Sequence, residues 1–317
     1  HSLHHQGTYE PSLFPALGLP AETAPLVSHH GAVNLLKGAL VAADMITTVS
    51  PTYAWEIRTR EGGQGLDELL HARADRLVGI LNGIDPSEWD PAVDPHLVAR
   101  YSAADLRGKA QCRRALCEAA GLAADDTGMI LGAIGRLTEQ KGFDVLLDAV
   151  PQLLAAGTRI VMLGSGDSQL ERRMLGYAAA HPGRFHAWLG YDEARAHSIE
   201  AGADSFIMPS RFEPCGLNQL YSLAYGTPPI VRHTGGLADT VIAYHGHNLD
   251  SANGFSFHEL TPAAIVGTVA WARQAMAQGA WPQLVENAMR ADFSWQRAEE
   301  HYAEVYRRAR THRGLPW

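Results

Sequence analysis

From residue 127 onward, short apolar segments alternate with stretches in which apolar side chains recur every three or four positions. This alternation is typical of βα units around a parallel sheet, whose buried strands are apolar on both faces. The pattern predicts strands over residues 128–134, 159–163, 184–189, 205–208 and 229–232. We therefore expect this part of the chain to form a domain built on a parallel sheet.

Two stretches between these strands are predicted to be helices. Residues 143–156 carry apolar side chains at helical spacing up to Gly157, and Pro151 is expected to kink this helix. Its apolar face consists of Leu146, Leu147, Val150, Leu153 and Leu154. A second helix is predicted over residues 217–225 and is closed by Gly226.

The region upstream has its own elements. Residues 44–49 and 77–81 are predicted to be strands, and a helical stretch runs between them from residue 51 to about residue 60. The polar segment 119–126 combines glycine with acidic residues between two periodic regions, so it is the candidate hinge. These upstream strands are assigned to a separate domain.

A length of 317 residues exceeds what one hydrophobic core usually holds, which favours more than one domain. Residues 1–120 are assigned to the remainder of an N-terminal domain and residues 121–297 to a C-terminal domain. Residues 298–317 begin with a mixed-charge helix, which taken alone is a solvated surface helix. By analogy with the fold named below, this helix is expected to pack back toward the N-terminal domain.

The composition narrows the possible functions. Hydrophobic residues make up 46% and charged residues 19%, with no apolar run of about 18 residues, so a membrane protein is not expected. The formal charge of −8, without a Lys/Arg cluster, argues against a nucleic-acid surface. Three cysteines without a CxxC spacing favour a reducing compartment, and cytoplasm is the expected location. The first residue is His1, and no initiator Met or signal sequence is present, which predicts a fragment.

The segment GAIGRLTEQKGFD, residues 132–144, has the pattern of an anion site. It ends a predicted strand, exposes Arg136 and Lys141 on a loop and then opens a helix. Strand ends and helix N-termini face the ligand crevice of open α/β sheets, and two cations five residues apart can hold a diphosphate from two directions. The alternative is a pair of solvated loop cations.

Two further segments follow predicted strands. The first segment, residues 209–227 (PSRFEPCGLNQLYSLAYGT), places Glu213 just before a helix. A carboxylate there can accept hydrogen bonds from sugar hydroxyls or stabilise positive charge on an oxocarbenium-like carbon. The helix N-terminus beside it can hold a departing phosphate. A simple helix-cap carboxylate would also explain it. The second segment, HTGGLADT, contains Gly235 and Gly236. Because glycine has no side chain, the backbone amides there can approach a ligand closely. Two glycines also suit an ordinary tight turn.

Several other chemistries lack a motif. No HExxH, P-loop or GxSxG pattern occurs, and LGSGD lacks the third glycine of a dinucleotide fingerprint. The paired histidines His4/His5 and His29/His30 cannot share one helical face. We therefore expect no bound metal, no nicotinamide cofactor and no hydrolase or kinase activity.

Taken together, the segments GRLTEQKG, LGYDE, EAGADSFIMPSRFEPCGLNQLYSLAYGT, TGGLADT, TVSPTYAWEI, ILNGID and DFSW resemble the bacterial glycogen synthase and plant starch synthase family. The resemblance implies a GT-B-type fold of two facing, doubly wound Rossmann-like domains, with the N-terminal, acceptor-side domain incomplete here and the nucleotide sugar bound mostly by the C-terminal one. It implies transfer of glucose from ADP-glucose to the non-reducing end of an α-1,4-glucan with retention. The implied partners are this donor and the glucan, without cofactor, metal, nucleic acid or membrane.

The resemblance also assigns roles to residues. Arg136 and Lys141 match the positions that neutralise the donor diphosphate, and Glu213 matches the carboxylate near the transferred glucose. His1 matches the histidine that approaches the glucose, and Tyr191 the ring beside adenine. Backbone groups near the sugar or phosphates are implied for Cys215, Gly216, Leu217, Gly235 and Gly236.

This chain departs from the family pattern at three places. The segment HSLHHQG differs from the family's HNLAYQG, and the family's KxGGL loop lies upstream of His1. Tyr221 stands eight residues after Glu213, where many retaining transferases have a second Glu. Two alternatives therefore stay open: a truncated chain that binds nucleotide or glucan without catalysis, and a related transferase that uses UDP-glucose.

Overall fold

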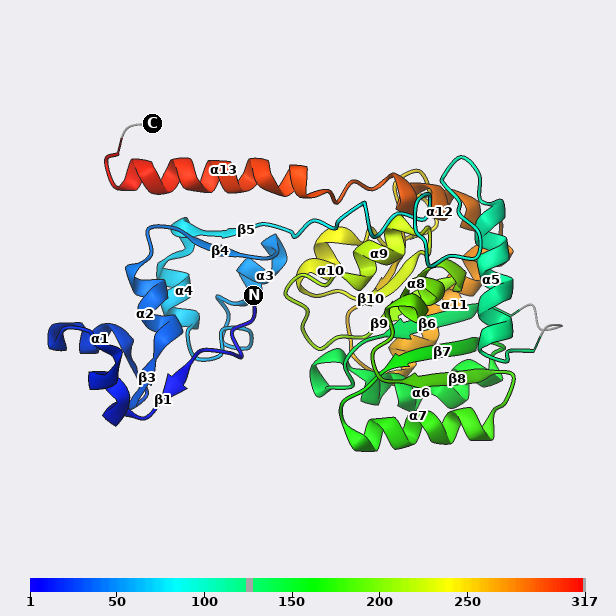
Figure 1. The fold of residues 1–317 in the computed structure, drawn as a ribbon, viewed down its shortest axis with the longest axis horizontal. Coiled ribbons are helices and arrows are strands. Elements are labelled where there is room, and N and C mark those ends of the chain that lie inside the picture. The colour runs from blue at the N-terminus through cyan, green and yellow to red at the C-terminus, as the bar shows by residue number, and fades with distance from the viewer. Residues whose placement is uncertain (124–127, 316–317) are drawn as a thin grey trace. The chain divides into compact units, whose positions relative to one another are not determined.

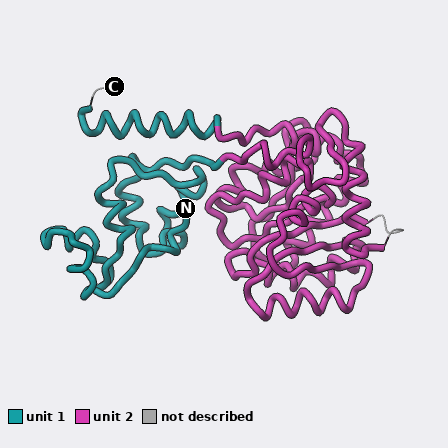
Figure 2. Tube along the Cα trace, viewed as in Figure 1, with its two compact units in different colours: residues 1–82, 296–317 teal, residues 83–295 magenta. Residues whose placement is uncertain are grey.

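The structure is a computed structural model that describes residues 1–123 and 128–315. The chain divides into two compact units (Figure 2). Unit 1 comprises His1–Asn82 and Gln296–Trp317, and unit 2 comprises Gly83–Trp295. None of the helices formed by the described residues is long and apolar enough to cross a membrane.

In the described part of unit 2, six parallel strands form one sheet (Figure 1). They are β6 (Ile130–Ile134), β7 (Arg159–Gly164), β8 (Phe185–Leu189), β9 (Ser205–Met208), β10 (Pro229–Arg232) and β11 (Phe255–Phe257). Their order is β11-β10-β9-β6-β7-β8. This is the order of a doubly wound Rossmann sheet, whose direction of winding reverses between β6 and β9. The carboxyl ends of these two strands therefore border the expected ligand crevice.

The five predicted strands of this region are present, with ends that differ by at most two residues. The strand β11 was not predicted. It is three residues long and pairs with β10 from Ile230↔Phe255 to Arg232↔Phe257. Such a short Phe-Ser-Phe segment has too few positions to show a period, so only its place at the sheet edge identifies it.

Helices cover both faces of this sheet. They are α5 (Arg107–Ala119), α6 (Phe143–Ala155), α7 (Ser168–Ala180), α8 (Glu193–Gly202), α9 (Asn218–Ala224), α10 (Gly235–Thr240), α11 (Pro262–Ala277) and α12 (Trp281–Arg290). Leu131 packs into the cluster that includes residues of α6 and α11, whereas its neighbour Ile130 packs into the cluster that includes residues of α5 and α8. Successive residues of one strand thus pack into two different cores, as expected of a sheet buried on both faces. Helix α6 runs through Pro151 as one element.

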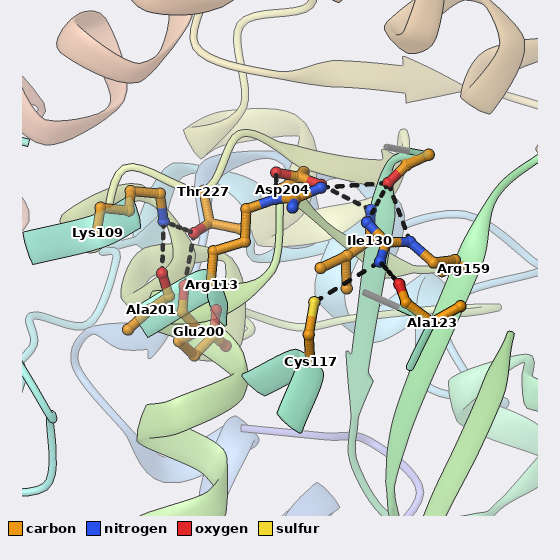
Figure 3. A network of polar contacts seen from close by, with 11 residues as sticks. Lys109, Arg113, Cys117, Ala123, Ile130, Arg159, Glu200, Ala201, Asp204 and Thr227 are labelled. Carbon is orange, nitrogen blue, oxygen red and sulfur yellow. Dashed lines mark hydrogen bonds and ion pairs between the residues drawn. The ribbon is translucent and has the colours of Figure 1, made fainter. Parts of the chain in front are cut away.

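The boundary between the units lies at Asn82–Gly83, not near residue 120 as the sequence suggested. The physical reason is that α5 packs along α8 and is tied to the sheet by polar contacts (Figure 3). Arg113 Nε donates to Asp204 Oδ1 at 2.8 Å, and Asp204 Oδ2 accepts the backbone N–H of Ile130 at 2.7 Å. In the candidate hinge 119–126, residues 124–126 lie outside the described residues.

Unit 1 contains two small sheets. The strands β4 (Ile46–Thr48) and β5 (Leu77–Gly79) pair in parallel, and β1 (Thr8–Tyr9), β3 (Ala32–Asn34) and β2 (Ser28–His29) pair antiparallel. The helices include α1 (Ala24–Val27), α2 (Leu35–Ala42), α3 (Pro51–Glu56) and α4 (Asp67–Ala72). The two strands predicted over residues 44–49 and 77–81 correspond to β4 and β5.

The last helix, α13 (Trp295–His312), belongs almost entirely to unit 1. Its residues Ala298 and Val305 pack against Ile80, just after β5. Beyond the helix, Arg313 Nε donates to Asp44 Oδ1 at 2.8 Å. The C-terminal segment thus completes a small core beside the β4–β5 pair.

Candidate functional site

The centre of the candidate site is an ion pair at the reversal point of the unit 2 sheet. Lys141 lies at the end of a short 3₁₀ helix (Glu139–Lys141) that follows β6, and Glu213 lies in the loop that follows β9. The Lys141 Nζ atom is 2.6 Å from Glu213 Oε2. Because β6 and β9 are neighbours, two residues 72 positions apart in sequence meet at the carboxyl edge of the sheet.

Backbone packing fixes both loops. Gly142, directly after Lys141, has φ +68°, and a Cβ there would lie 1.9 Å from the carbonyl oxygen of Pro209. The turn that carries Lys141 is therefore pressed against the residue directly after β9, and only glycine fits. Arg211 adds a second tie, because its guanidinium contacts both carboxylate oxygens of Asp144 at 2.7 and 2.8 Å. The same contact holds the pKa of Asp144 below its ordinary value.

The Glu213 carboxylate is buried and well partnered. The residue is 5% exposed, and its Oε2 accepts the Ser210 hydroxyl at 2.9 Å as well as Lys141. Such charge-assisted hydrogen bonds offset the cost of removing a carboxylate from water. The alternative of a plain helix-cap carboxylate does not describe this side chain, since its partners are the Lys141 ammonium on another loop and the Ser210 hydroxyl on its own loop.

Gly235 and Gly236 pack against the backbone around Glu213. Gly235 has φ +45°, and a Cβ there would lie 2.0 Å from the Glu213 carbonyl oxygen. A Cβ on Gly236 would lie 2.1 Å from the Cys215 carbonyl oxygen, and the Gly236 N–H donates to the Glu213 carbonyl at 3.0 Å. The Gly236 amide therefore holds the Glu213 loop, and the contact of these two glycines with a phosphate stays a prediction.

Other predicted residues lie at the same sheet edge. Arg136 follows β6 and is exposed, and its guanidinium has no partner among the residues that the structure describes. Tyr191 follows β8 and is 89% exposed. Leu217 is 39% exposed, whereas Cys215 is 5% exposed. Gly216 lies between them and has φ +75°.

His1 is an exposed residue of unit 1, and the remaining predicted site residues belong to unit 2. His1 lines a cavity of about 330 Å³ whose walls also include Leu3, Leu40 and Ile46. The structure therefore brings Lys141, Glu213, Gly235 and Gly236 together within one unit, and His1 is not part of that cluster.

Sequence reasoning missed three residues that support the site. Ser210 bonds Glu213, Asn218 Nδ2 donates to the Ile134 carbonyl at 3.0 Å, and Gln219 Nε2 donates to the Cys215 carbonyl at 3.0 Å. Each lies within the 209–227 segment, which the sequence already marked as a candidate site. The sequence does not show which group a hydroxyl or amide in such a loop will bind.

Metal ligands are not clustered in this part of the molecule. Over residues 1–123 and 128–315, no three His, Cys, Asp or Glu side chains are grouped so that they could hold an ion. The charged groups at this edge of the sheet include Arg136, Lys141 and Glu213. Two cations and one carboxylate at such an edge suit a substrate that combines a diphosphate with a polyhydroxyl group.

Comparison with known proteins defines the class. Residues 1–72 match the family model of the starch synthase catalytic domain, and residues 128–272 match that of the group 1 glycosyl transferases. Sucrose-phosphate synthase from Thermosynechococcus elongatus shares the fold at 21% identity, with a TM-score of 0.56 over 90% of this chain and 60% of that one. The sheet order and these matches define a GT-B-type glycosyltransferase fold.

Nearer relatives define the family. The chain is 48% identical to glycogen synthase from Halorhodospira halophila over 99% of its own length, and 50% identical to that from Aromatoleum aromaticum over 96%. It superposes with a TM-score of 0.89 and 37% identity on the catalytic domain of starch synthase IV from Arabidopsis thaliana bound to ADP and acarbose, over 98% of this chain and 66% of that one. The chain belongs to the family of bacterial glycogen synthases and plant starch synthases. It spans 66% and 63% of the two glycogen synthases.

Proposed function

We propose that this chain carries the donor site of a glycogen synthase that transfers glucose from ADP-glucose to the non-reducing end of an α-1,4-glucan with retention. The observation that carries the proposal is the Lys141–Glu213 ion pair at the reversal point of the sheet, with exposed Arg136 on the adjoining loop. The relatives named glycogen synthase and the starch synthase bound to ADP and acarbose support the choice of donor and acceptor.

In the proposed reaction, Arg136 and Lys141 neutralise the donor diphosphate. An ammonium group has three donors, so Lys141 can hold Glu213 and a phosphate oxygen at once. Glu213 accepts hydrogen bonds from hydroxyl groups of the glucose and stabilises positive charge at the anomeric carbon of that glucose. The bond from that carbon to the β-phosphate oxygen breaks, and the acceptor hydroxyl attacks from the same face. Its proton passes to the leaving phosphate, so ADP departs and configuration is retained.

The rest of the proposal follows from this scheme. Tyr191 is placed beside the nucleotide base, where an exposed ring stacks on adenine or uracil alike. Cys215, Gly216 and Leu217 are placed near the sugar through their backbone, and His1 is placed on the acceptor side. The reaction uses no cofactor and no metal, because two side-chain cations supply the charge. The free cysteines Cys112, Cys117 and Cys215 favour a cytoplasmic location.

A transfer assay tests the proposal. Radiolabelled ADP-glucose is incubated with the chain and glycogen, with labelled UDP-glucose in a parallel reaction. We expect incorporation from ADP-glucose, and loss of that incorporation by on the order of 10²-fold in the Glu213→Gln variant. The control is Asp148→Asn on α6, an exposed partner of Arg173. Equal rates for Glu213→Gln and the wild type would overturn the role of Glu213.

The chain's span of about two thirds of its relatives gives a second candidate function. In that case the chain binds the nucleotide without transferring glucose. Nucleotide binding without incorporation of label would favour this second function, and preference for UDP-glucose would favour the related transferase.

A further inference from the structure

Helix α9, which begins at the donor site, is held along one face by an aromatic stack. The contact comes from residues 83–106, which we call the connecting segment because they lead from the unit boundary to α5. The Trp89 ring of this segment stacks on Tyr221 of α9, with centroids 3.6 Å apart and planes 9° apart. Its other face stacks on His197 of α8 at 3.9 Å and 14°. Trp89 thus fixes α9 against α8.

The end of α9 is fixed by the same segment. The Tyr225 hydroxyl donates to Asp94 Oδ2 at 2.5 Å, and His197 Nδ1 lies 2.8 Å from the same oxygen. The Tyr225 carbonyl accepts the Tyr101 hydroxyl at 2.8 Å. Asp94 and Tyr225 are completely buried. A buried carboxylate with such partners has little freedom, so the helix end cannot shift without breaking the network.

A third set of bonds ties the helix end to α5 and α8. Lys109 Nζ donates to the Tyr225 carbonyl at 3.0 Å. It also donates to the Thr227 hydroxyl at 2.7 Å (Figure 3). The Ser222 hydroxyl donates to Glu200 Oε2 at 2.6 Å. These contacts surround the C-terminal half of α9.

The opposite end of the helix carries the site. Asn218 bonds the carbonyl that ends β6, and Gln219 bonds the Cys215 carbonyl in the loop that follows Glu213. Helix α9 has only seven residues. A helix this short is not stable on its own, so its packing partners decide where it lies. A change at the connecting segment therefore reaches the loop from Glu213 to Leu217 through one short rigid element.

We propose that Trp89 is a positioning residue of the donor site: stacked between Tyr221 and His197, it holds α9, and with it the 213–217 loop, in the conformation that binds the nucleotide sugar. This inference rests on the proposed function, since it concerns the same site. It adds a residue far from that site in sequence, in the segment that precedes the sheet.

The test uses hydrogen exchange and ADP titration on the whole chain. Trp89→Leu removes the stack but keeps an apolar side chain, and Trp89→Phe keeps a ring on Tyr221. The matched control is Trp271→Leu, because Trp271 also stacks on a tyrosine of unit 2, Tyr244, with centroids 5.5 Å and planes 7° apart. Tm is measured for each variant to confirm folding.

We expect amide exchange in residues 213–225 to rise about 10-fold in Trp89→Leu, and the ADP Kd to rise by a similar factor, since misplacing a site by about 1 Å can cost on the order of 10²-fold. Trp89→Phe is expected to restore both, and Trp271→Leu to lower Tm without changing either. Unchanged exchange in Trp89→Leu, or faster exchange with an unchanged Kd, would overturn the inference. If the wild type binds no ADP, the proposed function fails, and the exchange rates still decide whether Trp89 holds α9.

Discussion

Unit 2 and unit 1 differ in how fully packed apolar residues cover their strands. In unit 2, the described strands form one sheet whose apolar residues pack into clusters on both faces. In unit 1, the parallel pair β4–β5 lies beside a cavity of about 330 Å³ lined by apolar residues such as Leu40 and Ile46. Lys141 and Glu213 both belong to unit 2, whereas His1 belongs to unit 1.

This difference has a consequence for stability. The larger core of unit 2 removes more apolar surface from water, and each buried leucine contributes through transfer and packing. Unit 1 has a smaller buried cluster that includes Leu40, Tyr53 and Leu70. We therefore expect unit 1 to unfold at lower denaturant than unit 2, with the Lys141–Glu213 ion pair surviving the unfolding of unit 1.

The largest expected effect separates the two unfolding steps. Leu146 of α6 and Leu70 of α4 are both completely buried, one in each unit. Replacing either by alanine should cost about 2–5 kcal/mol of unfolding free energy. In urea titrations followed by circular dichroism, Leu70→Ala should move only the first transition and Leu146→Ala only the second. A single transition shifted equally by both variants would show that the units unfold as one.

The second prediction concerns the backbone beneath Glu213. Gly235→Ala places a Cβ against the Glu213 carbonyl at a positive φ and should destabilise unit 2 by about 1–3 kcal/mol. The control is Gly267→Ala in α11, where a Cβ meets open space and should stabilise by about 0.5–1 kcal/mol. Thermal unfolding measures both. Equal Tm values for the two variants would contradict the close approach.

The third prediction concerns pH. Burial raises the pKa of Glu200 from 4.5 to about 8, and burial lowers the pKa of Lys109 to about 8. Between pH 4.5 and 8 the folded state holds a proton on Glu200 that the unfolded state has lost, so its stability contribution falls as pH rises through that range. Lys109 acts in the opposite direction, above pH 8.

The measurement is the unfolding free energy from urea titrations at pH 5 and pH 8. The wild type should lose about 3–4 kcal/mol more than Glu200→Gln between these values, since the whole interval lies between the unfolded and folded pKa values of Glu200 and each pH unit there corresponds to about 1.4 kcal/mol. Glutamine keeps an acceptor for the Ser222 hydroxyl. Parallel pH dependence in both proteins would mean that Glu200 titrates normally.

The strands β6 to β10 of unit 2 were predictable because buried parallel strands leave continuous apolar runs in the sequence. The unit boundary was not, since the contacts that fasten residues 83–119 to unit 2 join distant positions. Asp94 and Tyr225 are 131 residues apart, and Arg113 and Asp204 are 91 apart. Polar pairs at such separations leave no local pattern, whereas a turn-rich segment does, so the sequence pattern pointed to residues 119–126 and not to the unit boundary at Asn82–Gly83.

The site was predictable in part for the same reason. Lys141 and Glu213 each stood out, because a charged residue after a predicted strand points to the ligand edge of the sheet. Their direct pairing, 72 residues apart, depends on β6 lying beside β9. The positions of Gly235 and Gly236 were also visible, but their role in packing against the Glu213 loop needed the fold.

The central proposal is that unit 2 binds the nucleoside diphosphate at the Lys141–Glu213 site. Calorimetric titration of the chain with ADP, and with UDP in parallel, tests it most directly. Lys141→Ala leaves Glu213 buried without its cation, so the double variant Lys141→Ala/Glu213→Gln separates lost binding from lost stability. The account predicts saturable ADP binding by the wild type, and binding weaker by on the order of 10²-fold in both variants. No ADP binding by the folded wild type, or wild-type affinity in both variants, would contradict it.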